Sequence, residues 1–164
     1  PADFVHVPKA DLPMLEGEGK AVRLILGTGW GAAAPVPTPS EMVYADAALE
    51  PGARLPLPDE HEDRALYVVS GEVATAGQRF GPGQMMVFRP GDRISATAGP
   101  EGARLIVLGG ATLGGPRHIW WNFVASSRER IEAAKEAWRT GDRAGGRFSL
   151  PPTDNAEFIP LPDR

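Results

Sequence analysis

Residues 52–93 read GARLPLPDEHEDRALYVVSGEVATAGQRFGPGQMMVFRPGDR, and this stretch decides the fold. It combines apolar runs that are too short for helices with glycines at the points where the runs end. Short apolar runs separated by Gly/Pro turns are typical of antiparallel strands. The stretch also contains a knot of ionisable side chains, DEHED at 59–63, so a chemical centre, if the chain has one, is expected here.

The same strand pattern continues on both sides of this stretch. Expected strands or strand pairs lie at 21–26, 42–49, 53–57, 65–69, 72–80, 84–88, 94–98 and 104–108. Ala76 and Gly77 form the expected turn of the hairpin at 72–80, Ser70 and Gly71 are expected to end the strand before it, and 99–102 is expected to be a turn. Strands of about five residues at intervals of roughly ten favour an antiparallel sandwich or barrel.

The character of the sequence changes after the glycine pair at 109–110. An aromatic segment at 116–124 precedes Ser126 and Glu129, which have the spacing of a helix capping box. Apolar residues then follow at helical spacing up to Gly141, which is expected to end one amphipathic helix. The remainder is polar and rich in proline, and it is expected to be an extended tail.

Composition excludes several classes of function. The 164 residues carry a net charge of −4, which gives no basic footprint for nucleic acid or an anionic membrane. The chain has no cysteine, which removes thiol catalysis and thiolate metal sites and fits a reducing compartment. No apolar run approaches the ~20 residues of a membrane span, and no signal layout opens the chain, so a cytoplasmic location is expected.

The histidines decide whether the predicted β-structure can hold a transition metal. Such a site needs three or four nitrogen or oxygen ligands that converge. Between His61 and His118 the chain has no histidine, so the strands at 84–98 can supply none and a three-histidine site inside a barrel is impossible. Two interpretations of the acidic residues at 59–63 remain. They form a solvated loop, which is the usual role of a run of charges, or an all-oxygen site for a hard cation.

Two groups of residues are candidates for binding. Asp59, Asp63 and Tyr67 are candidate pocket-lining residues if Ala65, Tyr67 and Val69 point into the barrel, because alternate strand residues share a face. The second group is aromatic and is either a partner or interdomain surface or the anchor of the helix to its own domain. Its members are Trp120, Trp121, Phe123 and Trp138.

Three segments resemble the pirin family. PRHIWWNFVASSRERIEAAKEAWRTGDRAGGRF at 116–148 and EFIPLP at 157–162 look like the C-terminal part of pirins, and LPDEHEDRALYVVSGEV at 57–73 resembles the corresponding segment of their second barrel. The resemblance implies a bicupin, in which two jelly-roll barrels pack face to face. In that family the metal site, three histidines and a glutamate, belongs to the N-terminal barrel, and some members have quercetin 2,3-dioxygenase activity while others are described as transcriptional cofactors.

The family's metal motif, His-Pro-His-Arg-Gly before a Tyr-Val-x-x-Gly strand, can be placed on this chain by its shared strand at 67–71. The two histidine positions then fall on Leu57 and Asp59, and the glutamate position falls on Asp63. The resemblance therefore implies the metal-free second barrel, with no catalytic or metal-binding residue in this chain. A divalent metal such as Fe or Ni is expected only in an N-terminal barrel outside these 164 residues.

The expected architecture is an all-β cupin-type jelly roll (double-stranded β-helix) with one C-terminal α-helix and an extended tail. Its parts are an N-terminal arm or linker at 1–20, the barrel at 21–115, and the aromatic segment, helix and tail at 116–164. The expected function is structural and partner-binding, the partner being the N-terminal barrel of the same protein or a second copy. The alternative is that the chain is part of a quercetin 2,3-dioxygenase-like enzyme whose active site lies in that N-terminal barrel.

Overall fold

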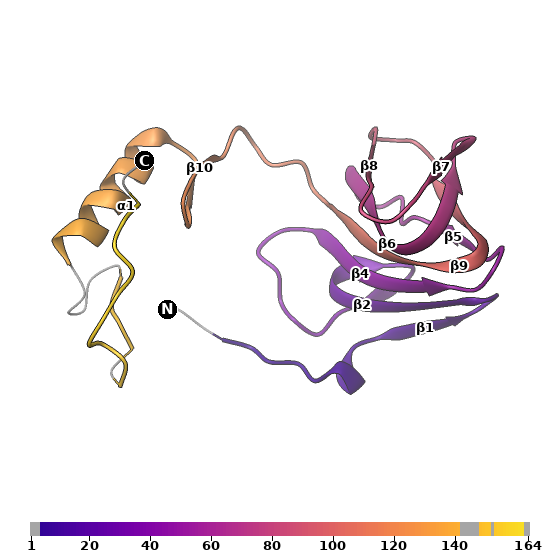
Figure 1. The fold of residues 1–164 in the computed structure, drawn as a ribbon, viewed down its shortest axis with the longest axis horizontal. Coiled ribbons are helices and arrows are strands. Elements are labelled where there is room, and N and C mark those ends of the chain that lie inside the picture. The colour runs from indigo at the N-terminus through magenta and orange to yellow at the C-terminus, as the bar shows by residue number, and fades with distance from the viewer. Residues whose placement is uncertain (1–3, 142–147, 152, 163–164) are drawn as a thin grey trace. The chain divides into compact units, whose positions relative to one another are not determined.

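The computed structural model describes residues 4–141, 148–151 and 153–162. The chain divides into two compact units, Pro1–Thr112 and Leu113–Arg164. Unit 1 contains the large β-sheet, and unit 2 contains a short β-hairpin, the helix and the tail (Figure 1).

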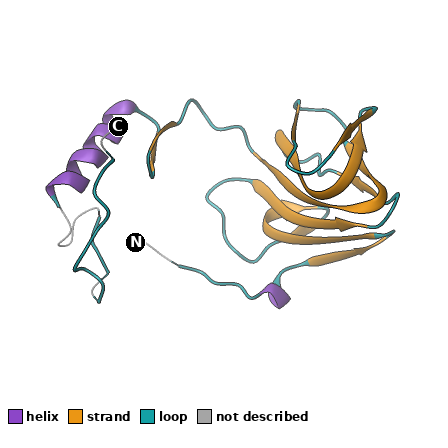
Figure 2. Ribbon diagram, in the orientation of Figure 1, coloured by secondary structure: helices purple, strands orange, loops and turns teal. Residues whose placement is uncertain are grey.

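Unit 1 is built on one antiparallel sheet, whose hydrogen-bonded path runs β1-β2-β4-β9-β6-β7. Three further strands pair off this path, β3 with β2, β5 with β9 and β8 with β6, and the sheet curls over itself (Figure 2). The expected all-β class is confirmed, although the described path is open between β1 and β7 and is no closed barrel. The strands are β1 (Met14–Gly17), β2 (Lys20–Gly29), β3 (Ala32–Ala33), β4 (Met42–Leu49), β5 (Arg54–Pro56), β6 (Asp63–Thr75), β7 (Gln78–Phe80), β8 (Met85–Phe88) and β9 (Ser95–Gly110), and a 3₁₀ turn, η1 (Lys9–Asp11), precedes them.

The two longest strands, β6 and β9, are continuous where the sequence predicts interruptions. The expected strand end at Ser70 and Gly71 and the expected turn at 99–102 were wrong. Gly71 has φ +74°, and a Cβ placed on it would lie 2.1 Å from the carbonyl oxygen of Gly102. The β6–β9 register shifts on both sides of Gly71. These glycines therefore bend a paired strand instead of ending it.

The faces of β6 are the reverse of those expected. Leu66 and Val68 are fully buried, whereas Tyr67 and Val69 are exposed on the other face. The prediction that Ala65, Tyr67 and Val69 point inward was wrong because the run is apolar on both faces, so its period carries no information about which face is the core. The largest fully buried side chains of unit 1 are Leu24, Val43, Leu55, Leu66, Val68, Val73, Leu105 and Val107.

The N-terminal segment is more regular than the expected arm at 1–20. Residues Met14–Gly17 form β1, which pairs with β2 from Met14↔Arg23 to Gly17↔Lys20. A local hairpin thus adds an edge strand to the sheet. By contrast, the strand at 42–49 and the hairpin turn at Ala76 and Gly77 are confirmed.

Unit 2 contains a short hairpin, β10 (His118–Trp120) with β11 (Phe123–Ala125), and the helix α1 (Arg128–Thr140). The N-cap is Ser127, whose hydroxyl accepts from Arg130 N, so the expected cap at Ser126 was one residue early. Gly141 ends α1 in the left-handed region, as predicted. Of the helices in the described residues, none has the length and apolarity needed to cross a bilayer.

Neighbouring valines on β6 test the observed faces. Val68→Ala is expected to lower the free energy of unfolding by about 2 kcal/mol, because it removes two buried methyl groups and leaves a cavity. The matched change Val69→Ala, on the exposed face, is expected to cost about 0.5 kcal/mol or less. Urea denaturation measures both, and equal losses would contradict the assigned faces.

Candidate functional site

The acidic residues of the 59–63 loop are exposed to solvent. Asp59, Glu60, Glu62 and Asp63 are all exposed, whereas His61 is only 4% exposed. Within the described residues, no group of three or more His, Cys, Asp or Glu side chains is arranged to hold a metal ion. The loop therefore has the geometry of a solvated turn with one inward-facing histidine.

His61 and Arg64 connect this loop to neighbouring segments from inside the fold. His61 Nε2 lies 2.8 Å from the carbonyl oxygen of Thr28, and because a carbonyl only accepts, Nε2 is the protonated nitrogen. Arg64, 3% exposed, donates from Nη2 to the carbonyl oxygen of Asp92 at 2.6 Å. His61 Nδ1 and Arg64 Nε are buried and have no hydrogen-bond partner among the described residues. These two side chains hold the loops at this end of the sheet together.

The structure does not gather the three predicted pocket residues around an interior cavity. Asp59 lies in the exposed loop, and Asp63 accepts a hydrogen bond from Thr112 Oγ1 at 3.0 Å. Tyr67 lies on the outer face of β6, opposite Met85 and Ile106. That any of the three contacts a ligand stays a prediction.

The outer face of the sheet carries a continuous apolar surface that spans five neighbouring strands. One row of directly paired residues runs across β2, β4, β9, β6 and β8, and residues paired across strands share a face. Met85 is 53% and Val87 is 77% exposed. We call this surface the outer apolar face; it consists of Leu26, Tyr44, Ala65, Tyr67, Val69, Met85, Val87, Ile106 and Leu108.

An ion pair lies at the border of the outer apolar face. Arg104 on β9 donates from Nε and Nη2 to the two carboxylate oxygens of Asp46 on β4, at 2.9 and 3.0 Å. Asp46 is directly opposite Ile106, a member of the face. The hydrogen bond from Arg104 lowers the pKa of the Asp46 carboxyl below its usual value, and the positive charges of Arg104, Arg23 and Lys9 act in the same direction.

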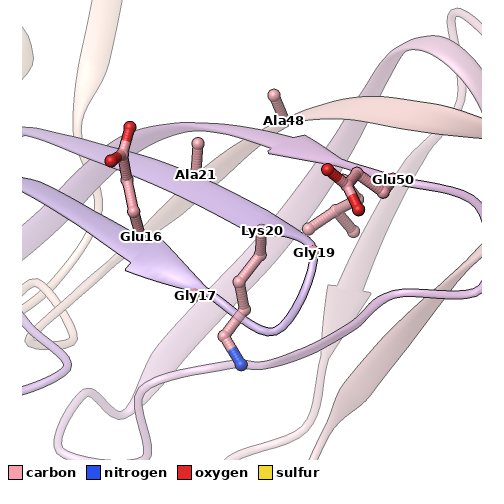
Figure 3. Close-up of a pocket in the computed structure, with 8 residues that line it drawn as sticks. Glu16, Gly17, Gly19, Lys20, Ala21, Ala48 and Glu50 are labelled. Carbon is pink, nitrogen blue, oxygen red and sulfur yellow. The ribbon is translucent and has the colours of Figure 1, made fainter.

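A hollow of about 480 Å³ lies beside the β1–β2 hairpin and the end of β4 (Figure 3). Its polar groups are Glu16, Lys20 and Glu50. Lys20 extends away from both of these carboxylates in Figure 3 and pairs with Glu18. Among the described residues that line this hollow, no group of metal-ligating side chains converges.

The aromatic residues predicted as a partner surface form the core of unit 2. Phe123 is buried with Ile131 and Ala134, and Trp120, Trp121 and Trp138 are partly buried against them. Ring contacts such as Trp121–Trp138, at 5.5 Å between centroids, join the hairpin to α1. These aromatic side chains therefore anchor the helix to the hairpin within unit 2. That the exposed parts of their rings contact a partner stays a prediction.

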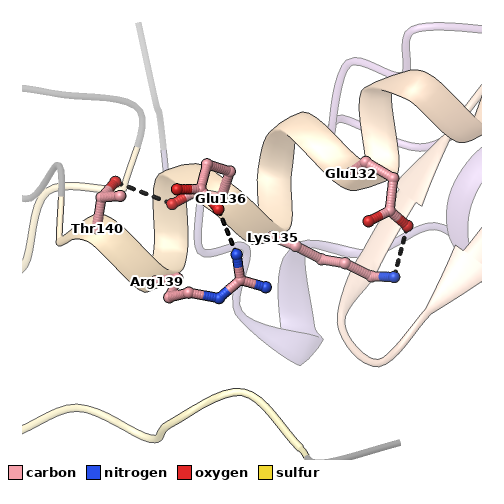
Figure 4. A network of polar contacts seen from close by, with 5 residues as sticks. All are labelled: Glu132, Lys135, Glu136, Arg139 and Thr140. Atoms are coloured by element: carbon pink, nitrogen blue, oxygen red, sulfur yellow. Dashed lines mark hydrogen bonds and ion pairs between the residues drawn. The ribbon is translucent and has the colours of Figure 1, made fainter.

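A groove of about 510 Å³ lies between α1 and the tail of unit 2. Its walls combine aromatic rings, prolines and the charged side chains of α1. Figure 4 shows those charges paired along the helix, Lys135 with Glu132 at 2.6 Å and Arg139 with Glu136. The lining residues are Trp120, Glu132, Lys135, Trp138, Arg139, Phe158, Pro160, Leu161 and Pro162.

Reasoning from the sequence missed the outer apolar face, although the signal was present. The runs at 65–69 and 85–88 are apolar at consecutive positions, whereas a strand with one solvated face alternates. Such runs indicate strands that are covered on both faces. Arg64 was also missed, and its long-range bond to Asp92 leaves no local trace in the sequence.

Comparison with known proteins identifies the relatives of this chain. Residues 44–144 match the model of the Pirin C-terminal cupin domain. A pirin-like protein of Caulobacter vibrioides is 42% identical over 158 residues, which are 96% of this chain and 52% of the relative. Pirin-1 of Arabidopsis thaliana is 26% identical over 139 residues, 80% of this chain and 48% of the relative. The chain thus spans about half the length of the curated relatives it matches.

Solved structures give the same picture of the fold. A crystal structure of quercetin 2,3-dioxygenase from Acinetobacter baumannii superimposes with a TM-score of 0.77 at 25% identity, covering 94% of this chain and 52% of that one. A second structure of a quercetin 2,3-dioxygenase from the same organism has a TM-score of 0.75 at 23% identity, over 83% and 49%. The expected cupin-type fold is confirmed by these matches.

The ion pair at the border of the outer apolar face predicts a dependence of stability on pH. Because the folded-state pKa of Asp46 is lowered, its stabilising contribution is present above the unfolded pKa of about 3.9 and is lost as the pH falls through the folded pKa. Asp46→Asn is therefore expected to be less stable than the wild type at pH 7 and to approach it below about pH 4. Urea midpoints from pH 7 to pH 3 measure this, and a difference that persists unchanged at pH 3 would contradict the assignment.

Proposed function

Because the chain belongs to the pirin C-terminal cupin domain family, we propose that it is the structural, metal-free barrel of a pirin-like protein. Its outer apolar face packs against the other cupin barrel of the same protein. The relatives are about twice as long as this chain, which leaves room for such a barrel. The role of the chain is then to support and position its partner.

The observation that carries this proposal is the exposure of the outer apolar face. Met85 and Val87 are exposed to solvent on β8, a strand whose other face already packs in the core. Contiguous exposed apolar surface on a folded protein is typical of an interaction site, because covering it releases water and desolvates few polar groups, here the hydroxyls of Tyr44 and Tyr67. Another curled sheet is a suitable occupant, since apolar strands pack face to face in β-proteins.

The residues in this chain do not fit the metal that the family keeps in its N-terminal barrel. Leu57, which stands at one of the histidine positions implied by the resemblance, is buried in the apolar core. Asp59 and Asp63, at the other two positions, are exposed. In the described residues no third ligand converges with them, so these positions do not form the family's metal site.

The second candidate function is enzymatic and belongs to the intact protein. The match to a quercetin 2,3-dioxygenase structure at 25% identity favours it. In this proposal the catalytic metal and substrate lie in the partner barrel, and the present chain contributes stability and shape to the assembly. The same proposal includes a cytoplasmic location, because the absence of cysteine is consistent with a reducing compartment. It also includes the absence of nucleic-acid partners.

A charge placed in the outer apolar face tests the first proposal. The probe is the half of the Caulobacter vibrioides pirin-like protein that this chain does not match, produced separately. Val87→Asp is expected to weaken binding of this probe by more than about tenfold, because an unpaired carboxylate would be buried at the contact. Titration calorimetry measures the dissociation constant.

Val124→Asp provides the matched control, because Val124 is also exposed but lies in unit 2. It is expected to leave binding unchanged. Loss of binding in Val124→Asp with full binding in Val87→Asp would move the contact to unit 2 and overturn the proposal. Dimerisation of the chain alone, abolished by Val87→Asp, would assign the face to a second copy instead.

Metal analysis and an oxygen-uptake assay test the absence of chemistry in this chain. The purified chain is expected to carry substoichiometric iron, nickel and zinc, and to consume no oxygen with quercetin, because its described residues contain no metal-ligand set. The full-length Caulobacter vibrioides relative serves as the comparison under the same conditions. One tightly bound metal ion per chain would refute the metal-free assignment.

A further inference from the structure

The tail of unit 2 is held against α1 in a specific way. Trp138 Nε1 donates a hydrogen bond to the carbonyl oxygen of Ile159 at 2.9 Å. The ring of Phe158 meets the ring of Trp138 edge-on, at 6.3 Å between centroids and 71° between planes. Leu161 packs against the aromatic core of unit 2. Figure 1 shows this tail in yellow beside α1.

The tail has the chemistry of a preorganised extended ligand. Residues 157–162 read EFIPLP, and they form no helix or strand. Pro160 and Pro162 fix their own φ and bias Ile159 and Leu161 towards extended backbone, so little conformational entropy remains to be lost on binding. With prolines at alternate positions, backbone carbonyls are the main polar groups that such a segment offers to a receptor.

The surface that the β10–β11 hairpin and α1 present to the tail, which forms the opposite wall of the groove, has the matching chemistry of a receptor for such a segment. Trp120 and Trp138 provide apolar faces, and the Lys135 ammonium lies 4.3 Å from the centre of a Trp120 ring, a favourable cation–π contact. The indole N–H of Trp138 donates a hydrogen bond to the carbonyl oxygen of Ile159, the residue before Pro160. Aromatic grooves with a hydrogen-bond donor are the general solution for recognising proline-rich extended peptides.

We propose that unit 2 is a binding site for extended segments of the type aromatic–aliphatic–Pro–aliphatic–Pro, and that the chain's own tail occupies it as an intramolecular ligand. The occupant that replaces the tail is a segment of this chemistry on another polypeptide. The tail remains accessible for exchange, since Ile159 is 70% exposed, and the groove retains about 510 Å³ beside it. This site is independent of the outer apolar face.

Occupation by the tail follows from its tether. A short linker gives a bound segment an effective concentration in the millimolar range, so the tail outcompetes a free peptide of equal intrinsic affinity below that concentration. A second polypeptide displaces the tail either when it makes tighter contacts with unit 2 or when the tail's own contacts are weakened. Weakening the tail is therefore the way to reveal the site.

The experiment uses the full chain with a loosened tail and a labelled peptide of residues 153–162, TDNAEFIPLP. The double variant Pro160→Ala/Leu161→Ala is expected to bind this peptide more tightly than the wild type does, by fluorescence anisotropy. The matched control Leu150→Ala/Pro151→Ala changes the same residue types outside the groove and is expected to behave as the wild type. Adding Trp138→Phe to the loosened chain removes one hydrogen bond and is expected to weaken binding about two- to tenfold.

The proposal is overturned if the loosened chain keeps its helix, measured by circular dichroism, and does not bind the peptide. Equal binding of a peptide in which both prolines are alanine would overturn it as well. Hydrogen exchange on the wild-type chain covers the case in which the loosened chain does not fold. The tail amides at 157–159 and 161 are expected to exchange faster than the amides of α1, and their exchange is expected to accelerate when excess peptide is added. If the tail and α1 exchanged only through global unfolding, the tail would be a fixed part of the core.

Discussion

The close approach of β6 and β9 at Gly71 and Gly102 is the contact on which the curled sheet depends. A Cβ atom at Gly71 would collide with the backbone of Gly102, and one at Gly102 would lie 2.6 Å from the carbonyl oxygen of Leu49. Because both positions lack side chains, two long strands stay paired from Asp63↔Gly110 to Ala74↔Thr97 while they bend. On one side of the bend β8 pairs with β6 at Arg64–Tyr67, and on the other side β5 pairs with β9 at Ser95–Thr97.

Features of the fold that depend on neighbouring residues could be predicted from the sequence, and features that depend on distant pairing could not. Met42–Leu49 is a short, mostly apolar run that ends before a Pro-Gly turn, and Ala76 and Gly77 adopt positive φ in a tight turn, so strand and turn follow locally. The faces of β6 are different. Leu66 is directed inward together with its partners Met86 and Val107, and that choice is made by cross-strand packing, since Tyr67 is nearly as apolar as its neighbours.

The same limit applies to the ionisable knot at 59–63. Its composition identifies it as polar, yet His61 is buried while the acids around it face solvent. The difference arises from partners that lie far along the chain, Thr28 for His61 and Asp92 for Arg64. Both partners are backbone carbonyls, which every residue has, so no residue type marks them. His61 and Arg64 thus connect this loop to two distant loops of the fold.

The polar border of the outer apolar face limits how a partner can lie on it. A barrel that covered Met85, Val87 and Ile106 and continued over Asp46 would bury the Asp46–Arg104 ion pair, and burying an ion pair costs more than it returns unless every polar atom is satisfied. Contact centred on β6 and β8 avoids that cost and still covers the most exposed members of the face. A partner that avoided this cost would therefore contact the β6–β8 side of the outer apolar face and leave the Asp46–Arg104 ion pair in solvent.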